Sequence, residues 1–322
     1  MKRTFITHAT EKYVDICVNL VKSIREFSDT NIIVYLIDTN QESYNKFKDF
    51  KSVEVVFLDL GIDEPDNYIY TENGNFYVDR TNLRTFYVLS AKVLSMKKSL
   101  ESGWDLVCYL DSDCIATPMV DDIFDWSKNI TTFPIGTNGI HEYMMLVQNN
   151  NLIGNPFEHT WPSADNTKCL EWPLMEFMDL KPENRGQYRT TGIMLMNKDC
   201  IPFISLWEKV CNLLPQITNI IKYAPFHEET IYNVMTWKIN DTGFPLCYIN
   251  LGEGLNTVKD FYNTNHKTNS LVDYNENDTK THFYKIPEDK KNVKVLHGEK
   301  NKNEVDKIIN YLKELNNNGY FK

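Results

Sequence analysis

The stretch LVCYLDSDC, from Leu106 to Cys114, joins an apolar run to two aspartates and decides the fold class. Five apolar residues in a row predict a short strand buried on both faces. Three similar runs precede it, RTFIT at 3–7, NIIVYLI at 31–37 and VEVVFL at 53–58. Helices are predicted between these strands, over 13–27, 42–50 and 83–100. Strands that alternate with helices predict an α/β chain with a mainly parallel sheet flanked by helices.

Asp111 and Asp113 directly follow the strand, where the functional residues of a parallel sheet collect. By the same rule, chemistry is expected just after Ile6 and Ile37. In an extended segment, two carboxylates two residues apart share one side of the chain and can reach one cation. Their oxygens, together with diphosphate oxygens, suit Mn²⁺ or Mg²⁺, which neutralises a diphosphate leaving group. The alternative is a solvated turn without a ligand.

Other chemistries that use an Asp-x-Asp triplet fit this one less well. In phosphatases of the haloacid-dehalogenase kind, the nucleophilic aspartate follows the first strand and the motif ends in Thr or Val. Here the pair lies deep in the chain, and Ile115 stands at the Thr/Val position. A calcium loop needs further oxygen ligands, which the run from Cys114 to Val120 largely lacks. An Asp-x-Asp phosphatase remains a lesser alternative.

The composition is that of an ordinary globular protein, with 322 residues and a formal charge of −10. Such an acidic surface repels nucleic acid, and a phosphate ligand needs a local cation. The seven cysteines are scattered and form no CxxC pair, which argues against a zinc site and for a reducing compartment. No signal peptide is recognisable, and no apolar run reaches the roughly 18 residues of a spanning helix. We expect a cytoplasmic protein with no transmembrane segment and no nucleic-acid partner.

Several motifs follow one another in order along the chain. They are FITHATEKY at 5–13, YLDSDCIA at 109–116, DDIFDW at 121–126, TTGIMLMN at 190–197, EETIYN at 228–233 and VLHGEK at 295–300. In this order they resemble elements of glycosyltransferase family 8, which comprises glycogenin and galactosyl- or glucosyltransferase-like enzymes. The resemblance covers most of the chain. It implies the GT-A fold, with a Rossmann-like, mainly parallel central sheet.

The resemblance implies a nucleotide site beyond the first strand. There Thr7, His8 and Tyr13 would hold and stack a uracil ring, although Tyr13 could instead be a packing residue of the first helical turn. Asp38 ends the second strand, where it would accept from the base or ribose, or cap a turn. Ser112 of the aspartate triplet is a further expected donor contact.

Cations for the diphosphate and the sugar are expected on the helix over 83–100. Arg84 and Lys92 are eight residues apart, a little over two turns, and so lie roughly on one side of it. Arg80 is an alternative to Arg84. Because the protein is acidic, cations placed just before the metal-binding strand are reasonable ligands for a diphosphate.

The C-terminal part of the chain would complete the metal site. His297 follows a short strand-like run, and its neutral imidazole would join the aspartate pair as a ligand. Gly298 comes directly after it and is counted with the donor site. Either Lys300 or Lys302 would contact the departing diphosphate, since the spacing H-x-x-G-x-x-K of the family is not kept.

Four residues are expected around the donor sugar. Gly192 allows close backbone approach, and Thr190, which stands where the family has Asn, would bond a hydroxyl. Glu228 and Glu229 stand where the family has Asp-Gln. A carboxylate there would orient the sugar or stabilise an oxocarbenium-like transition state. Glutamates that open a helix also simply suit its dipole.

Residues 131–189 are rich in glycine, proline and aromatic residues, and the part from Gly136 to Arg189 is expected to shape the acceptor site. Regular structure is predicted again as a strand over 191–197 and helices over 203–214, 228–237 and 303–315. Without an internal repeat or a linker, one compact domain is expected. Its nucleotide-sugar-binding half is 1–126, and its acceptor-binding half with the C-terminal metal-histidine segment is 127–322.

The expected activity is transfer of a hexose from a UDP-sugar to a glycan or another hydroxyl acceptor, dependent on Mn²⁺ or Mg²⁺. Glu228, Glu229 and Lys92 are the expected catalytic residues. The resemblance favours retention of configuration, whereas inversion would need one of the two glutamates as a general base. The alternative from another class is an inactive glycan- or nucleotide-sugar-binding protein on the same fold.

Overall fold

The structure is a computed structural model of the whole chain. It describes residues 1–61, 68–70, 76–78, 83–129, 134–137, 172–181, 191–214, 228–241, 247–250, 255–257, 272–273, 282–283, 294–297 and 302–321. The strands are β1 (Arg3–Thr10), β2 (Asn31–Ile37), β3 (Val53–Leu58), β4 (Tyr68–Tyr70), β5 (Phe76–Val78), β6 (Leu106–Leu110), β7 (Cys114–Ala116), β8 (Pro134–Thr137), β9 (Ile193–Asn197), β10 (Cys247–Asn250), β11 (Leu255–Thr257), β12 (Val272–Asp273), β13 (His282–Phe283) and β14 (Val295–His297).

The helices are α1 (Val14–Phe27), α2 (Gln41–Asn45), α3 (Leu83–Glu101), α5 (Trp172–Phe177), α6 (Ile201–Leu213), α7 (Glu228–Asp241) and α9 (Lys302–Asn317), with 3₁₀ helices η1 (Glu11–Tyr13), η2 (Val120–Asn129) and η4 (Lys198–Cys200). None of the helices in the described part of the chain is long and apolar enough to cross a membrane.

The central sheet has seven strands among the described residues, in the order β10-β8-β9-β6-β1-β2-β3. Strands β6, β1, β2 and β3 are parallel, and β8 is parallel to β10. Strand β9 runs antiparallel to both β6 and β8, which therefore point the same way. The prediction of an α/β chain with a mainly parallel central sheet is confirmed, and β9 is its antiparallel exception.

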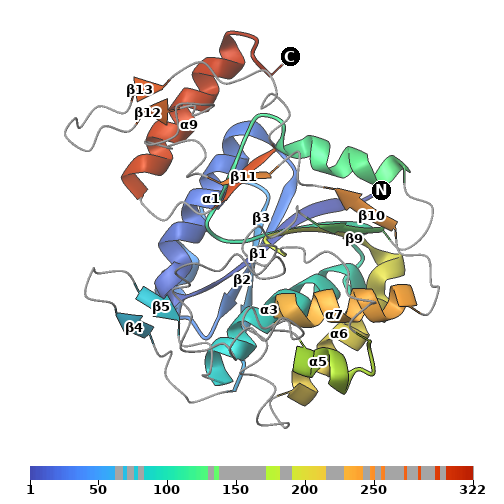
Figure 1. The fold of residues 1–322 in the computed structure, drawn as a ribbon. Helices are drawn as coiled ribbons and strands as arrows, with labels where there is room; N and C mark the ends of the chain where they lie inside the picture. The colour runs from blue at the N-terminus through green and yellow to red at the C-terminus, as the bar shows by residue number, and fades with distance from the viewer. Residues whose placement is uncertain are drawn as a thin grey trace.

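Helices cover both faces of this sheet, with α1 on one face and α3, α6 and α7 on the other (Figure 1). Each face has its own apolar core. One core joins α1 to the sheet through Val14, Leu20 and Ile24, and the other joins α3, α6 and α7 to it. Both cores are well buried, so apolar burial holds the strands in place and fixes where their ends lie.

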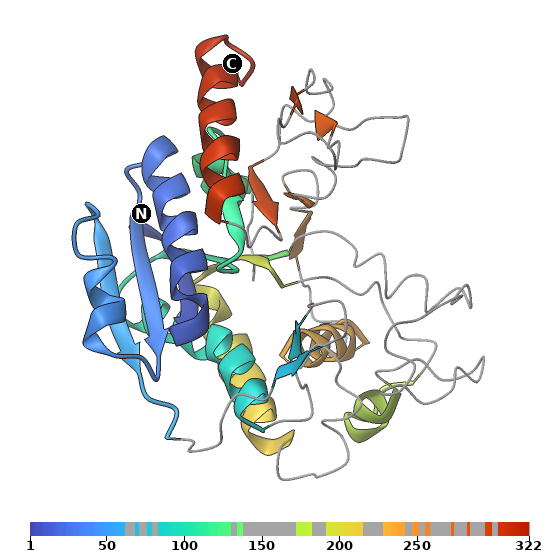
Figure 2. The same ribbon diagram turned by 90° about the vertical axis from the view of Figure 1, so that its left-hand side faces the viewer.

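A small sheet, β11-β14-β7, lies beside the central one. Helix α9 packs on it and on α1, and Figure 2 shows α9 beside α1. The contact consists of Ile115 and Leu296 from the small sheet and Val305, Ile308, Ile309 and Leu312 from α9. Ion pairs Lys22–Asp306 and Glu26–Lys313 flank it. Helix α9 thus holds β14 against β7, the strand that directly follows the aspartate triplet.

The boundaries of several elements match the predictions, including β2, β3 and β6. Two expectations are wrong. The first strand does not end near Thr7 but continues to Thr10, because β2 pairs with it as far as Ile37. The helix expected over 42–50 ends at Asn45. The division into halves at residues 126 and 127 stays a prediction.

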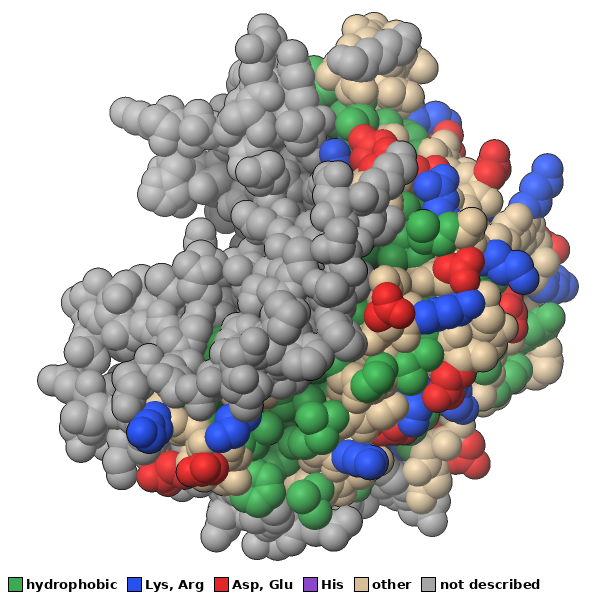
Figure 3. Space-filling model, turned by 90° about the vertical axis from the view of Figure 1, so that its right-hand side faces the viewer, with side chains coloured by type: hydrophobic (Ala, Val, Ile, Leu, Met, Phe, Trp, Pro, Cys, Tyr) green, Lys and Arg blue, Asp and Glu red, His purple; other side chains and the backbone are tan. Residues whose placement is uncertain are grey.

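Over the part of one face that the structure describes, acidic and basic side chains are interspersed with hydrophobic ones (Figure 3). Such mixing singles out no binding patch on this face.

Candidate functional site

Several polar and charged side chains converge where β1 and β6 end, β9 begins and α7 begins. Asp111 follows β6, and its backbone N–H donates to the carbonyl of Gly192, just before β9, at 2.8 Å. Antiparallel pairing of Leu110 with Ile193 brings these two segments together. Helix α3, which packs on one face of the sheet, supplies Lys92 to this cluster. The cluster thus lies at the carboxyl ends of the parallel strands, the place predicted for the chemistry.

Lys92 is at the centre of this cluster and is only 3% exposed. Its ammonium group donates to Glu228 Oε1 and to Thr191 Oγ1, both at 3.0 Å, and lies 3.3 Å from Asp111 Oδ1. It also lies 4.9 Å from the centre of the Tyr109 ring. One buried cation therefore joins the end of β6, the start of β9 and the start of α7.

Charge balance explains why a lysine can be buried here. Burial disfavours its charge, but the surrounding carboxylates outweigh burial and raise the pKa of Lys92 above its usual value. The pKa of Glu228 is raised by burial and held down in part by Lys92. Since a buried charge without its partner is costly, each member of the cluster depends on the others.

Glu229 holds the segment before β9 in place. Its Oε2 accepts from the Thr191 backbone N–H at 2.8 Å and from the Thr191 hydroxyl at 3.3 Å. Burial raises the pKa of Glu229 from 4.5 to about 7, although Lys92 and the Thr191 N–H act in the opposite direction. Glu229 therefore titrates close to neutral pH in the folded protein.

This shift predicts a pH-dependent stability. Between pH 4.5 and pH 7 the folded chain keeps a proton on Glu229 that the unfolded chain has lost, so stability falls as pH rises through this window. In Glu229→Gln this titration is absent. Between pH 5 and pH 8 the unfolding free energy of the variant should therefore fall by about 2 kcal/mol less than that of wild type. Urea unfolding at both pH values measures it. Glu54→Gln, at an exposed glutamate of β3, is the control; equal pH dependence in Glu229→Gln and wild type would contradict the assignment.

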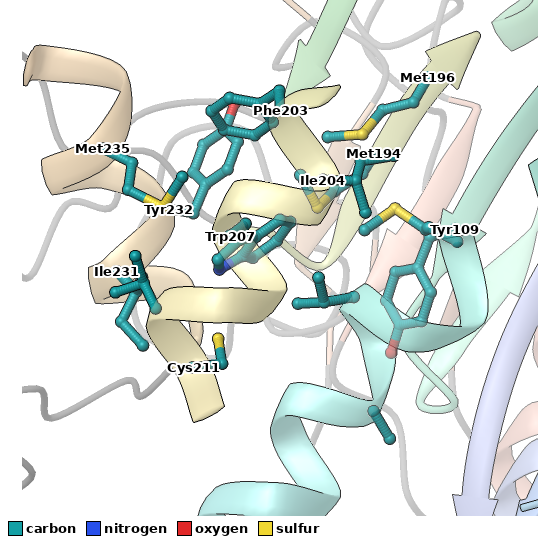
Figure 4. Close-up of a cluster of buried hydrophobic side chains, with 14 of the residues drawn as sticks. Tyr109, Met194, Met196, Phe203, Ile204, Trp207, Cys211, Ile231, Tyr232 and Met235 are labelled. Carbon is teal, nitrogen blue, oxygen red and sulfur yellow. The ribbon is translucent and has the colours of Figure 1, made fainter. Parts of the chain in front are cut away.

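The start of α7 is fixed by an aromatic cluster beneath it. Trp207 of α6 donates from its indole N–H to the Glu228 carbonyl at 3.0 Å. Its ring packs against Tyr232 and Phe203, with ring centres 5.2 and 6.2 Å away. Figure 4 shows Trp207 between α7 and the strand that carries Met194. The aromatic residues of α6 and α7 therefore set the position of the two glutamates.

A second set of hydrogen bonds leads from Asp111 to the first strand. The Tyr109 hydroxyl donates to Asp111 Oδ1 at 2.9 Å and lies 3.1 Å from His8 Nδ1. Burial, followed by the charge of Lys92, lowers the pKa of His8 to about 4, so this imidazole is neutral. Thr7 and His8 lie within β1 and are buried, which corrects the expectation that they lie beyond it.

The aspartate triplet also differs from the expectation of an extended segment. Asp111, Ser112 and Asp113 form a turn between β6 and β7, and the Cys114 N–H donates to the Asp111 carbonyl at 3.1 Å. The turn is stable because both flanking strands are paired. All three residues of the triplet are partly buried, and the Asp111 side chain is 28% exposed. The geometric argument for one shared side therefore fails, although both carboxylates remain within one tight turn.

The small sheet returns the C-terminal region to this turn. Strand β14 pairs antiparallel with β7, and His297 is opposite Cys114, the residue after Asp113. Paired residues of antiparallel strands lie roughly 4.5–5.5 Å apart at Cα. The His297 side chain lies outside the described residues, and the side chains that are described contain no group of three metal-ligating residues. Two carboxylates in one turn supply hard oxygen donors of the kind that Mn²⁺ or Mg²⁺ binds, and the backbone of His297 lies near this turn.

Asp38 and Arg84 bind each other, at 2.8 Å, with both side chains mostly buried. Asp38 adopts a left-handed conformation with φ of 49° after β2, and its Oδ1 accepts from the Leu60 N–H at 2.9 Å. This bond joins the end of β2 to the segment after β3 and is not the cap of a local turn, and the contact of Asp38 with a base or ribose stays a prediction. Arg84 and Lys92 both face inward from α3, as their spacing predicts.

The structure describes only some of the remaining predicted site residues. Tyr13 ends η1 and lies partly buried at the border of the α1 core, and its stacking on a base stays a prediction. Thr190, Gly298 and Lys300 lie outside the described residues, as does the side chain of Lys302, the first residue of α9. Their roles stay predictions.

Two members of the cluster, Tyr109 and Thr191, were not among the predicted site residues. Tyr109 precedes Asp111 by two positions, and in a strand this spacing places side chains on one face. That signal was available in the sequence. The contact between Thr191 and Lys92 depends on how α3 crosses the sheet, which local sequence does not encode.

Comparisons with known proteins add one likeness. No protein-family model matches the chain, and no curated protein matches its sequence. Among solved structures, the chain is similar to a galactosyltransferase, LgtC, crystallised in complex with donor and acceptor sugar analogues. The two are 12% identical, with a TM-score of 0.47, and the match covers 97% of this chain and 94% of the other. The function of this chain is therefore inferred from its own residues.

Proposed function

We propose that the chain is a metal-dependent glycosyltransferase that moves a hexose from a UDP-sugar to the hydroxyl of a glycan or another acceptor, with retention of configuration. The observation that supports it most is the buried cluster of Lys92, Asp111 and Glu228 at the carboxyl edge of the sheet. Such an edge is where open α/β sheets bind ligands. The ordered motifs of the sequence and the GT-A fold they imply agree with this proposal.

Asp111, Asp113 and His297 would hold Mn²⁺ or Mg²⁺. When bound, the metal would neutralise the diphosphate and make it a better leaving group. The chain supports this site through Asp111, whose Oδ1 accepts from Tyr109 and lies beside Lys92. Partners of this kind orient a ligating carboxylate.

Glu228 and Glu229 would meet the donor sugar. Both are at least nine-tenths buried, and within the described part of the chain Glu228 Oε2 and Glu229 Oε1 have no hydrogen-bond donor. A buried acceptor without a donor is costly, so hydroxyl groups of a bound sugar would stabilise these atoms. One carboxylate near the anomeric carbon would orient the sugar and favour positive charge developing there. Lys92 holds Glu228 in place for this task.

The nucleotide would occupy the ends of β1 and β2. Tyr13 would stack on the uracil ring, with Thr7 and His8 behind it and the Asp38–Arg84 pair near the ribose. Ser112, Thr190, Gly192 and Gly298 would line the donor site, and Lys300 or Lys302 would contact the diphosphate. A cytoplasmic location also belongs to this proposal.

Hydrolysis of a panel of UDP- and GDP-sugars, with Mn²⁺ and with EDTA, tests the proposal. The expected result is release of UDP from one or a few UDP-sugars that stops when EDTA is added. Absence of metal-dependent release, with UDP still bound, would indicate the inactive binding protein instead. Release of phosphate from a phosphomonoester, without any nucleotide sugar, would support the phosphatase.

A further inference from the structure

The Tyr109 hydroxyl joins two parts of the site that come from different strands. Tyr109 is 1% exposed and lies in β6, between β1 and β9. Its hydroxyl is 2.9 Å from Asp111 Oδ1 and 3.1 Å from His8 Nδ1, and its ring is held beneath the Lys92 ammonium. A hydroxyl so placed contacts both the proposed metal end and the proposed base end of the nucleotide site.

The number of available protons determines which group donates in the hydrogen bonds of the Tyr109 hydroxyl. A tyrosine hydroxyl has one proton, and the ionised Asp111 carboxylate can only accept it. The bond to His8 then needs a proton from Nδ1, so the neutral ring carries its proton on Nδ1 and leaves Nε2 as an acceptor. One phenol therefore sets the orientation of a carboxylate and the tautomer of an imidazole.

We propose that Tyr109 is a positioning residue for metal binding, which acts by holding Asp111 through Oδ1 and by fixing the His8 tautomer. The proposal rests on the proposed function, since it assigns Asp111 to the metal. It goes beyond that function because Tyr109, although it lies in the motif YLDSDCIA, is not among the predicted site residues. Hydrogen-bond partners of metal ligands commonly change metal affinity by about 10-fold to 100-fold when removed.

Tyr109→Phe tests this, with Tyr35→Phe as the matched control. Tyr35 is a buried tyrosine of strand β2, which is separated from β6 by β1, and its hydroxyl pairs with that of Ser99 at 2.7 Å, a residue outside the candidate site. Both variants lose one buried hydroxyl, but only one of them loses a partner of Asp111. Mn²⁺ affinity of the protein without nucleotide, from electron paramagnetic resonance titration, is the readout. Thermal melting reports folding.

Mn²⁺ affinity is expected to fall about 10-fold to 100-fold in Tyr109→Phe and less than about threefold in Tyr35→Phe. Equal affinities in Tyr109→Phe and wild type would overturn the positioning role and leave the proposed function standing. A wild type that binds no Mn²⁺ either alone or in the presence of UDP would overturn the proposed function itself.

A second measurement needs no variant of Tyr109 to fold. Nitrogen-15 NMR of the wild-type imidazoles, with His8 assigned by its absence in His8→Asn, should show the Nδ1–H tautomer at neutral pH. The Nε2–H tautomer at His8 would overturn the proposal.

Discussion

Asp113→Ala should lower sugar transfer at least about 100-fold, because a bound metal contributes several kcal/mol of charge stabilisation in the transition state. The unfolding free energy should change by less than about 1 kcal/mol, the usual range for a partly exposed position. The effect of Asp113→Ala is easier to interpret than that of Asp111→Ala, because Asp111 also accepts a hydrogen bond from Tyr109 and neutralises Lys92. Asp111→Ala should therefore abolish transfer and destabilise the fold as well.

Turnover of a UDP-sugar and urea unfolding, measured on the same preparations, check this pair of effects. Asp49→Ala is the control, since Asp49 is an exposed residue between α2 and β3 and is not a member of the candidate site. Near wild-type turnover in a folded Asp113→Ala protein would show that the triplet is only a turn.

Lys92→Met should destabilise the fold by about 3–5 kcal/mol, because it leaves buried carboxylates without their cation. Methionine nearly matches the length of the lysine stem, so the loss of charge is the main change. Glu228 and Asp111 would both lose the ammonium that lies within 3.3 Å of them. Transfer should be lost with it, as Glu228 would no longer be held.

Lys97→Met is the matched control on the same helix. Lys97 pairs with Glu208 of α6 at 2.6 Å, but both side chains are more than a fifth exposed. Pairs of this kind contribute about 0–1 kcal/mol. Urea unfolding of the two variants compares them directly. Equal destabilisation by both substitutions would contradict the charge cluster around Lys92.

The parts of the fold that sequence reasoning predicted are those that depend on local pattern. Apolar runs of strand length located β2, β3 and β6, and their alternation with helices led to a mainly parallel sheet. The end of β1 was missed because His8 and Thr10 are polar, although both are buried by pairing with β2. Burial of polar residues in a central strand depends on neighbours far away in sequence.

The site was predicted in its residue types more than in its geometry. Lys92, Glu228 and Asp111 were each predicted as site residues without any contact between them, yet the structure joins them directly. Their contact depends on how α3 and α7 pack against the sheet, which the spacing within each motif does not determine. Strand pairing likewise brings His297 opposite Cys114, across most of the chain length. Only the order of the motifs pointed to that return.

The central claim is that the return of β14 completes a metal site at the aspartate turn. Calorimetry of UDP binding, with Mn²⁺ and with EDTA, on wild type and His297→Ala tests it most directly. Mn²⁺ should strengthen UDP binding strongly in wild type and far less in His297→Ala, with equal affinities for UDP in EDTA, because the base and ribose contacts are unchanged. The same Mn²⁺ enhancement in both proteins would contradict it.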